Sequence, residues 1–233
     1  MKVKRIFFIL FIILLVSLII YSSVNLLKQK QIQKSIDSIN NNPIIYYEES
    51  GNAITKLQEE YNNKDIKGIL KVANTNIVLV QGIDNSYYLN HLIDKKINKT
   101  GSVFIDYRTN IDTSRQVNIY GHSSDYYNVS FNILKKYLNK KFYLDNKYIY
   151  IDTIDKSYKY EIFSVKVTSD EDHLKVIFNN LDEFNNHLIK LKNNSLYDTG
   201  VSVNENDKLL VLQTCINNNP LGKLLIINLR KVG

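Results

Sequence analysis

Covalent catalysis requires a nucleophile, and this chain has one cysteine that could supply it. Cys215 directly follows the apolar run at residues 209–214, and the chain has no second cysteine for an internal disulfide. A lone thiol can be an inert buried side chain, half of an intermolecular bridge, or a nucleophile. The residue type alone leaves these three interpretations open.

A nucleophilic thiol needs a base beside it, and His122 is the candidate. It follows the strand-like run at residues 116–120 and Gly121, much as Cys215 follows its own apolar run. Residues just beyond strand ends project over the rim of a sheet, and glycine permits a sharp change of backbone direction. A thiol and an imidazole at two strand ends would form the pair that cysteine catalysis requires.

The other three histidines are expected to have different roles. His173 lies in a charged loop and His187 in a predicted helix, so both are predicted to be solvated surface residues. His91 is interpreted as a packing or capping residue, and it is the next candidate should His122 not be the acid–base group.

The N-terminal segment predicts a membrane anchor. No charged residue occurs between Ile6 and Leu27, and about 22 residues of helix span about 33 Å, enough for a hydrocarbon core of about 30 Å. A cleaved signal peptide is the alternative, but its apolar region is typically about 7–15 residues and ends at a small-residue site. Lys2, Lys4 and Arg5 precede the span, and basic residues follow it at 28, 30 and 34, so the charge asymmetry is weak; a cytoplasmic N-terminus is the expected orientation. The remainder would then face the cell exterior.

The rest of the chain has the composition of one folded domain. The whole sequence is 44% hydrophobic and 11% aromatic with a formal net charge of +7. Part of that charge flanks the apolar run, and charges of both signs are interspersed elsewhere, which argues against a nucleic-acid interface. The acidic run at 169–173 lacks the spacing of an EF-hand loop, so neither a metal nor another cofactor is expected.

Short β-branched runs separated by turns predict a mostly-β domain. We expect strands at residues 66–72, 75–81, 101–107, 116–122, 208–214 and 223–232, and an alternating run at 141–168 that turns at 145–147 and 155–157 divide into further strands. Helices are expected at 28–39, 46–61 and 130–138, with a short helix or turn at 85–93. One clear helix at 180–194 would be capped by Asn180 or Asp182. This pattern predicts a small closed β barrel with appended helices.

These residues resemble the sortase family, class B, the cysteine transpeptidases of Gram-positive bacteria. "LQTC" at 212–215 is similar to the T-L-x-T-C signature, with Val211 at its first position, and "IYGH" at 119–122 is similar to the strand-end histidine motif. "QGIDNSYYLNHLIDKKINKTGSVFIDYR" resembles the class B segment before the histidine. The helix before the cysteine strand and the two N-terminal helices also resemble class B. The resemblance covers residues 66–232.

The resemblance implies an activity, partners and a location. Sortases cleave a C-terminal sorting signal of secreted proteins through a cysteine thioester and pass the acyl fragment to a cell-wall amine of the peptidoglycan. They are thiol proteases and hydrolases by chemistry, and the implied location is the cell membrane, single-pass, with an extracellular catalytic domain. Class B signals resemble N-P-x-T-N or S/P-P-x-T-G. The implied organisation is an anchor at 1–27, a helical segment at 28–63 and a catalytic barrel at 64–233.

The family pattern also assigns site residues. Cys215 corresponds to the nucleophile and His122 to the general acid and base, while Thr214 and Ser123 correspond to substrate-binding positions; the family often has Asn at the latter. The family arginine at the start of the last strand is replaced by Lys223, which lacks a planar guanidinium. Arg230 lies seven residues further along that strand, so it is expected to lie far from the rim.

The lysine keeps an alternative open. A catalytically weak sortase fold that binds the envelope is the second hypothesis, and neither Arg108 nor Arg115 is excluded from the groove by sequence. A transpeptidase of the L,D type is the third, but its cysteine stands in an S-x-G-C setting, which "LQTC" does not match.

Overall fold

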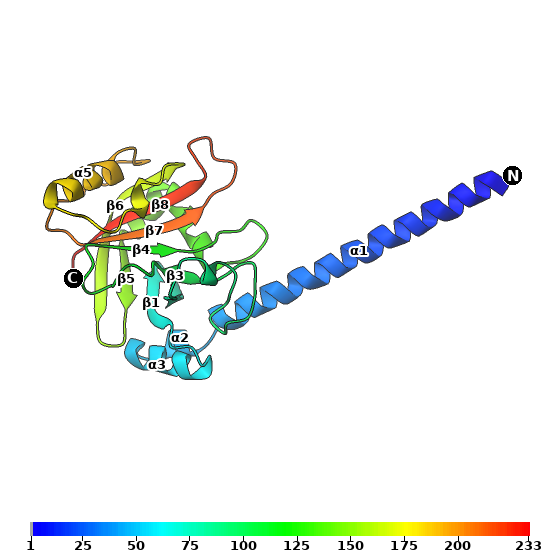
Figure 1. Ribbon diagram of the computed structural model, residues 1–233, viewed down its shortest axis with the longest axis horizontal. Helices are drawn as coiled ribbons and strands as arrows, with labels where there is room; N and C mark the ends of the chain where they lie inside the picture. Colours follow the sequence, from blue (N-terminus) through cyan, green and yellow to red (C-terminus); the bar gives the residue numbers. More distant parts are fainter. Residues whose placement is uncertain (1) are drawn as a thin grey trace. The chain divides into compact units, whose positions relative to one another are not determined.

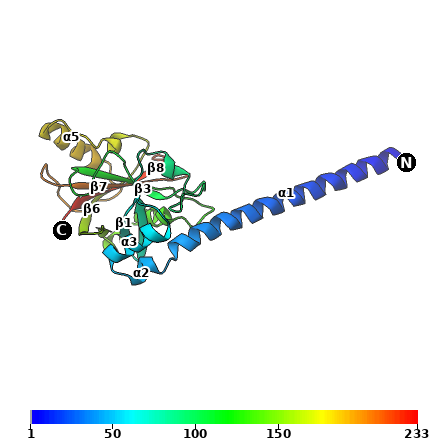
Figure 2. The same ribbon diagram turned by 60° about the horizontal axis from the view of Figure 1, so that its bottom comes forward.

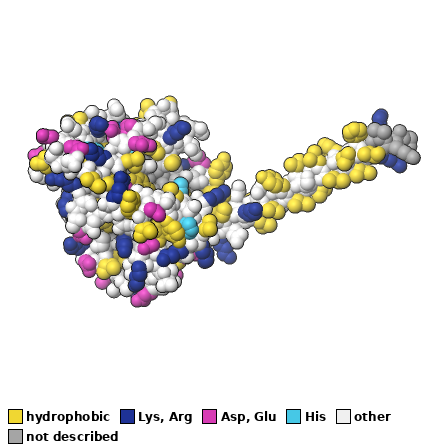
Figure 3. Space-filling model, in the orientation of Figure 1, with side chains coloured by type: hydrophobic (Ala, Val, Ile, Leu, Met, Phe, Trp, Pro, Cys, Tyr) yellow, Lys and Arg dark blue, Asp and Glu magenta, His cyan; other side chains and the backbone are white. Residues whose placement is uncertain are grey.

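The protein consists of two compact units, the first ending at Ile39 and the second comprising Asn40–Gly233. The structure is a computed structural model, and it describes residues 2–233 (Figure 1). The first unit belongs to one continuous helix, α1 (Lys2–Asn40), which contains both the apolar run and its predicted polar extension. Lys4–Asn40 is long and apolar enough to cross a membrane by length and composition, with a mean hydropathy of 2.8 in its most apolar stretch. Hydrophobic side chains line this helix (Figure 3).

The second unit is built around a closed eight-stranded barrel, as the sequence predicts. The strand order is β1-β2-β3-β4-β7-β8-β6-β5. All neighbours are antiparallel except β2–β3 and β4–β7, which are parallel. A parallel pair needs a long crossover, which the connection between β4 and β7 provides. The strands are β1 (Ile66–Val72), β2 (Thr75–Val80), β3 (Val103–Ile105), β4 (Gln116–Tyr120), β5 (Tyr148–Asp152), β6 (Ser157–Thr168), β7 (Leu209–Cys215) and β8 (Leu224–Lys231).

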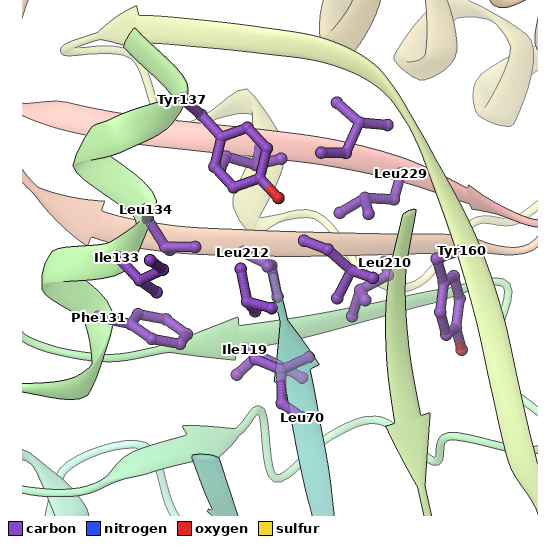
Figure 4. Packing of buried hydrophobic residues seen from close by; sticks show 14 of the residues in the cluster. Leu70, Ile119, Phe131, Ile133, Leu134, Tyr137, Tyr160, Leu210, Leu212 and Leu229 are labelled. Atoms are coloured by element: carbon purple, nitrogen blue, oxygen red, sulfur yellow. The ribbon is translucent and has the colours of Figure 1, made fainter. Parts of the chain in front are cut away.

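The barrel interior is filled by alternate side chains of the strands and is closed by a 3-10 helix. This helix, η2 (Ser130–Leu138), directs Phe131, Leu134 and Tyr137 toward the strands, where they meet Leu212 and Leu229 (Figure 4). All five side chains are fully buried. Burial of each such side chain contributes roughly 1.5–3 kcal/mol, so this cluster holds η2 firmly against β7 and β8.

A second, smaller cluster covers the outer face of the barrel. Helix α5 (Leu181–Lys192) begins at Asn180, whose side chain accepts a hydrogen bond from the Glu183 backbone, so Asn180 is the cap. Phe184, Leu188 and Leu191 on one face of α5 pack against outward side chains of β7, and the helix lies over this side of the barrel (Figures 1 and 2).

The remaining helices are short. They are α2 (Ile44–Tyr47), α3 (Ser50–Glu60), η1 (Tyr87–Leu89), α4 (Lys140–Asp145) and η3 (Asp172–Leu174). The single helix expected at 46–61 is therefore two, because the backbone is extended at Glu48 and Glu49.

One predicted strand is wrong. The alternating pattern at 141–145 forms α4, where the Asn139 side chain caps the helix by accepting from the Lys141 backbone. Phe142 packs edge-to-face on Tyr137, and Lys141 pairs with Asp145 one turn later. These contacts stabilise a helix that the alternation of residue types does not indicate.

The domain boundaries expected at 1–27, 28–63 and 64–233 stay a prediction.

Candidate active site at the ends of β4 and β7

The parallel pairing of β4 with β7 places Cys215 and His122 side by side. The last paired residues are Tyr120 and Gln213; Cys215 lies two residues beyond Gln213 in β7, and His122 lies two residues beyond Tyr120, just past the end of β4. Side chains alternate along a strand, so His122 and Cys215 share the outer face with that pair. Adjacent strands lie about 4.8 Å apart, which is within reach of a thiol and an imidazole. The thiol is exposed and the imidazole half-buried.

Backbone and hydroxyl contacts continue the pairing beyond the last residue of β4. The Gly121 backbone donates to the Gln213 carbonyl at 3.2 Å, and Thr214 Oγ1 donates to the Gly121 carbonyl at 2.7 Å. The Ser123 hydroxyl donates to the Cys215 carbonyl. Thr214 is 1% exposed, so it lies behind the rim and acts through the backbone that carries His122. Ser123 links the two strand ends directly.

Gly121 is required by packing. Its φ does not lie in the left-handed region. A Cβ at this position would lie 2.6 Å from the Phe131 ring, so any side chain would displace the aromatic plug of the barrel. The expected sharp change of backbone direction is therefore not the reason for glycine before the histidine.

The orientation of the His122 ring is set by a backbone carbonyl. Nε2 lies 2.9 Å from the carbonyl oxygen of Leu89, at the end of η1. A carbonyl oxygen only accepts, so Nε2 carries the proton and donates it. In the neutral ring Nδ1 is then the basic nitrogen, and it is the atom left for proton exchange.

A cavity of about 600 Å³ lies over the thiol, between the loops that follow the two strands. Cys215 and Lys223 both line it, and the Lys223 carbonyl accepts from the Ile216 backbone at 2.8 Å. Since Cys215 pairs with Leu224 in the antiparallel β7–β8 ladder, Lys223 stands one residue beyond the thiol's partner. The structure thus brings Lys223 to the same rim as Cys215. The cavity is lined by residues 125–126, 215–218 and 223–224.

The arginines of the second unit are engaged elsewhere. Arg230 pairs with Leu209 at the other end of β7 and binds Glu161 at 2.8 Å. Arg108 forms a two-pronged ion pair with buried Asp106. Arg115 precedes β4, at the strand end opposite His122, and donates to the Glu205 carbonyl. Lys223 is therefore the basic side chain that the structure places beside Cys215 in the cavity.

The two loops over the cavity are tied together by Asp125. Its carboxylate accepts from Lys135 Nζ at 2.7 Å and from Asn217 Nδ2 at 3.0 Å. The hydrogen bond from Lys135, then that from Asn217, holds the pKa of the Asp125 carboxyl below its ordinary value. The loop after the histidine thereby holds the loop after the cysteine.

His173 and His187 are buried, which corrects the prediction that they are solvated. They are 2% and 4% exposed. His187 Nε2 lies 2.7 Å from Gln116 Oε1, and His173 Nε2 lies 2.6 Å from Gln213 Oε1. Burial lowers the pKa of both rings, that of His187 to about 4. Charged neighbours in the sequence misled the prediction, because their side chains point outward while the imidazoles point toward the barrel.

The His91 ring is held by Tyr87. Its ring stacks on Tyr87 with centroids 4.0 Å apart, and Nδ1 lies 2.8 Å from the Tyr87 carbonyl. These contacts agree with its interpretation as a packing residue. Within residues 2–233 no group of three or more His, Cys, Asp or Glu side chains could hold a metal ion.

Two contributors to the site were not identified from the sequence. Leu89 acts through its carbonyl, which no residue type reveals. Asp125 stands three residues after His122, but its partner Asn217 lies far along the chain. The position of the charged Asp125 so soon after His122 was the sequence signal that could have identified it.

Comparisons with known proteins show the family to which the chain belongs. A family model described as the sortase domain matches residues 71–227. Sortase B of Listeria monocytogenes is 34% identical over 157 residues, a match that covers 66% of this chain and 63% of that protein. The matched segment thus spans less than two thirds of that relative.

Solved structures extend the likeness over most of the chain. Sortase B of B. anthracis, in complex with AAEK1, has a TM-score of 0.72 at 25% identity and covers 90% of this chain and 98% of its own. A sortase B–substrate complex of Staphylococcus aureus has a TM-score of 0.69 at 25% identity, covering 91% of this chain and 96% of its own. The family model matches most of the barrel, and both the sequence relative and the solved structures are sortase B proteins. This chain therefore belongs to the sortase family.

Proposed function

We propose that the protein is a class B sortase-like cysteine transpeptidase that uses Cys215 as nucleophile and His122 as general acid and base. The observation that carries the proposal is the β4–β7 register, which sets a thiol and an imidazole two residues past the same pair on one face. This is the geometry that a cysteine nucleophile and its base require.

In the acylation step the Cys215 sulfur attacks the carbonyl carbon of the scissile peptide bond. The thiolate is the nucleophile, so the thiol proton moves to Nδ1 of His122. The carbon–sulfur bond forms, the carbon–nitrogen bond breaks, and the imidazolium returns the proton to the leaving amine. The Leu89 carbonyl supports this exchange because it accepts from Nε2 whether the ring is neutral or charged.

In the transfer step an amine of the peptidoglycan attacks the thioester. Nδ1 of His122 takes the proton of this amine, the carbon–nitrogen bond forms, and the Cys215 sulfur leaves. The exposed thiol and the open cavity leave room for both substrates in turn. A thioester stays reactive toward amines, so the energy of the original peptide bond is retained for the new one.

Lys223 is proposed to stabilise the oxyanion that develops during both steps. It lines the cavity with Cys215, and a positive donor beside the reacting carbonyl favours the charge of the transition state. Ser123 and Thr214 support the same site through the Cys215 and Gly121 carbonyls. Their proposed contribution to substrate binding is to hold the edge of the groove in place.

The proposed substrates are secreted proteins with a C-terminal sorting signal. The S. aureus sortase B has been seen in complex with its substrate, and that structure covers 91% of this chain. Helix α1 is proposed to cross the cell membrane once and to place the barrel outside the cell, next to the peptidoglycan amines. No cofactor takes part in the proposed chemistry.

The test is mass spectrometry of the full chain, in detergent, with a panel of sorting-signal peptides of the N-P-x-T-N and S/P-P-x-T-G kinds. One peptide should add its acyl fragment to the fragment of the protein that contains Cys215. Scrambled peptides of equal composition are the control. Absence of a thioester with every peptide would refute the proposal.

A second candidate function is an envelope-binding module with a weak sortase site. The observation that favours it is Lys223 in place of arginine, with Arg108, Arg115 and Arg230 all engaged elsewhere. Binding of a sorting-signal peptide without acylation of Cys215 would support this candidate over the first.

A further inference from the structure

The three backbone carbonyls of η1 each accept from a different partner. Tyr87 accepts from the His91 ring at 2.8 Å, Tyr88 from the Ser102 backbone at 2.9 Å, and Leu89 from His122 Nε2 at 2.9 Å. The histidine thus depends on a carbonyl whose position is set by the segment packed beneath η1. That segment is the turn at residues 98–102.

Gly101 lies directly beneath the last two of these carbonyls. A Cβ built there would stand 2.4 Å from the Tyr88 carbonyl oxygen and 2.6 Å from the Leu89 carbonyl oxygen. Its φ is +56°, a conformation that glycine adopts without strain. Both neighbouring atoms belong to the backbone, so a side chain at 101 could be accommodated only by moving η1.

We propose that Gly101 is a positioning residue for His122. The missing side chain lets the Leu89 carbonyl approach closely enough to receive the Nε2 proton, which keeps the ring from turning and leaves Nδ1 for the thiol. The proposal rests on the proposed function for its catalytic meaning. The ring position itself can be measured without any activity.

The turn that carries Gly101 is itself tightly held. The Gly101 backbone donates to the Asn98 carbonyl at 2.9 Å, and the Asn98 side chain accepts from the Thr100 backbone at 3.1 Å and hydroxyl at 2.8 Å. Asn98 is 8% exposed. The contact beneath Leu89 is therefore part of a fixed turn, and Asn98→Ala should loosen it without adding atoms.

Two other glycines provide matched controls. Gly200 has φ +71° and no atom within 4 Å of a built Cβ, so Gly200→Ala introduces the backbone strain without a contact. Gly68 has no such φ, but its Cβ would lie 2.7 Å from the Asp152 carbonyl oxygen, so Gly68→Ala introduces a backbone clash elsewhere in the barrel. Gly101→Ala combines both effects at the η1 carbonyls.

The experiment measures the exchange of the His122 Nε2 proton by NMR on the full chain in detergent, with the signal assigned by its loss in His122→Ala. We expect the proton to be protected in the parent, Gly200→Ala and Gly68→Ala proteins. In Gly101→Ala its exchange should be at least about tenfold faster, and the acylation rate should fall about tenfold to a hundredfold, the scale of small misplacements of a catalytic group. Peptide affinity should change little.

Two results would overturn the proposal: fast exchange of this proton in the parent, or protection in Gly101→Ala equal to that in both controls. If Gly101→Ala fails to fold, Asn98→Ala decides, since it should show the same loss of protection, and unchanged protection there refutes the proposal. A protected proton in a parent that forms no thioester would refute the proposed function while leaving the positioning of His122 intact.

Discussion

The outer face of β4 and β7 has a covered half and an open half, and the same two strands supply both. At the covered half, Gln116 and Asn118 are fully buried and joined by a 2.8 Å hydrogen bond, with His187 bound to Gln116. At the open half, His122 and Cys215 extend past the cover. Imidazoles occur in both halves, so the residue type does not decide which of them can do chemistry.

The histidine rings of the two halves differ in their exposure to solvent and in the group to which each is hydrogen-bonded. Burial keeps the His187 ring neutral and bound to an amide, whereas His122 is half-buried and bound to a carbonyl that tolerates both of its charge states. The covered half fixes the strand register, and that register determines where the open half places its two reactive side chains. Precise positioning of catalytic groups requires that an exposed site be carried by a rigid part of the fold.

The largest effect should come from Cys215→Ala, which tests whether the open half is reactive at all. We expect peptide cleavage to be abolished, because no other residue can form the thioester. The thiol is exposed, so the free energy of unfolding should change by no more than about 0.5 kcal/mol. Peptide cleavage followed by chromatography and a denaturant titration check the two halves of this prediction. Cleavage that survives in this variant would refute the proposed function, in which Cys215 forms the thioester.

His122→Ala should be next, with turnover reduced by at least about a hundredfold, the usual scale of lost acid–base catalysis. His91→Ala is the matched control, since its ring stacks on Tyr87 and lies outside the pair. Single-turnover acylation of Cys215 is the measurement. A loss smaller than tenfold in His122→Ala, or a larger loss in His91→Ala, would transfer the acid–base role to His91.

Lys223→Ala tests the third position of the open half. Loss of one oxyanion donor costs about 2.7–4 kcal/mol, and we expect the lower end, about a hundredfold in acylation rate, because Lys223 is exposed. Lys223→Arg should retain or raise the rate, since it restores a planar fork of donors.

Arg230→Ala is the control for Lys223, because Arg230 binds Glu161 at the far end of the strand. Its effect on acylation should be no more than a few fold. An unchanged acylation rate in Lys223→Ala together with a lost acylation rate in Arg230→Ala would contradict the assignment of Lys223 as the cationic side chain beside Cys215.

The smallest effect concerns the covered half and appears in stability. Burial lowers the pKa of His187 from 6.5 to about 4, so between these values the unfolded chain binds a proton that the folded chain does not. The free energy of unfolding should therefore fall as the pH drops from 6.5 to 4, by about 3 kcal/mol from this residue. Above pH 6.5 the ring is neutral in both states and makes no such contribution.

His187→Gln should remove that part of the acid sensitivity, because a glutamine can donate to Gln116 without titrating. Denaturant titrations at pH 7 and pH 4.5 measure the difference, and the exposed neighbour on α5 provides a control in Asn186→Ala. Equal acid sensitivity in His187→Gln and the parent would show that burial does not lower the pKa of His187 in the folded protein.

Much of this protein could be predicted from the sequence because the signals are local. The uncharged run predicts the long apolar helix, and β-branched runs between turns predict the barrel strands. Cys215 and His122 each stand directly after such a run, so their strand-end positions were predictable from nearest neighbours. The Asn180 cap is local in the same sense.

Tertiary structure decided what depends on residues far apart in the chain. The parallel β4–β7 register and the burial of His173 and His187 result from packing between distant segments, which residue type and periodicity do not encode. The carbonyl of Leu89 and the bare Cα of Gly101 contribute through the backbone, so no side-chain pattern could reveal them. The sequence by itself determined which strand ends carry a thiol and an imidazole. Only the closing of the barrel determined that these two ends are neighbours, because a parallel pair joins segments that a long crossover keeps apart in the chain.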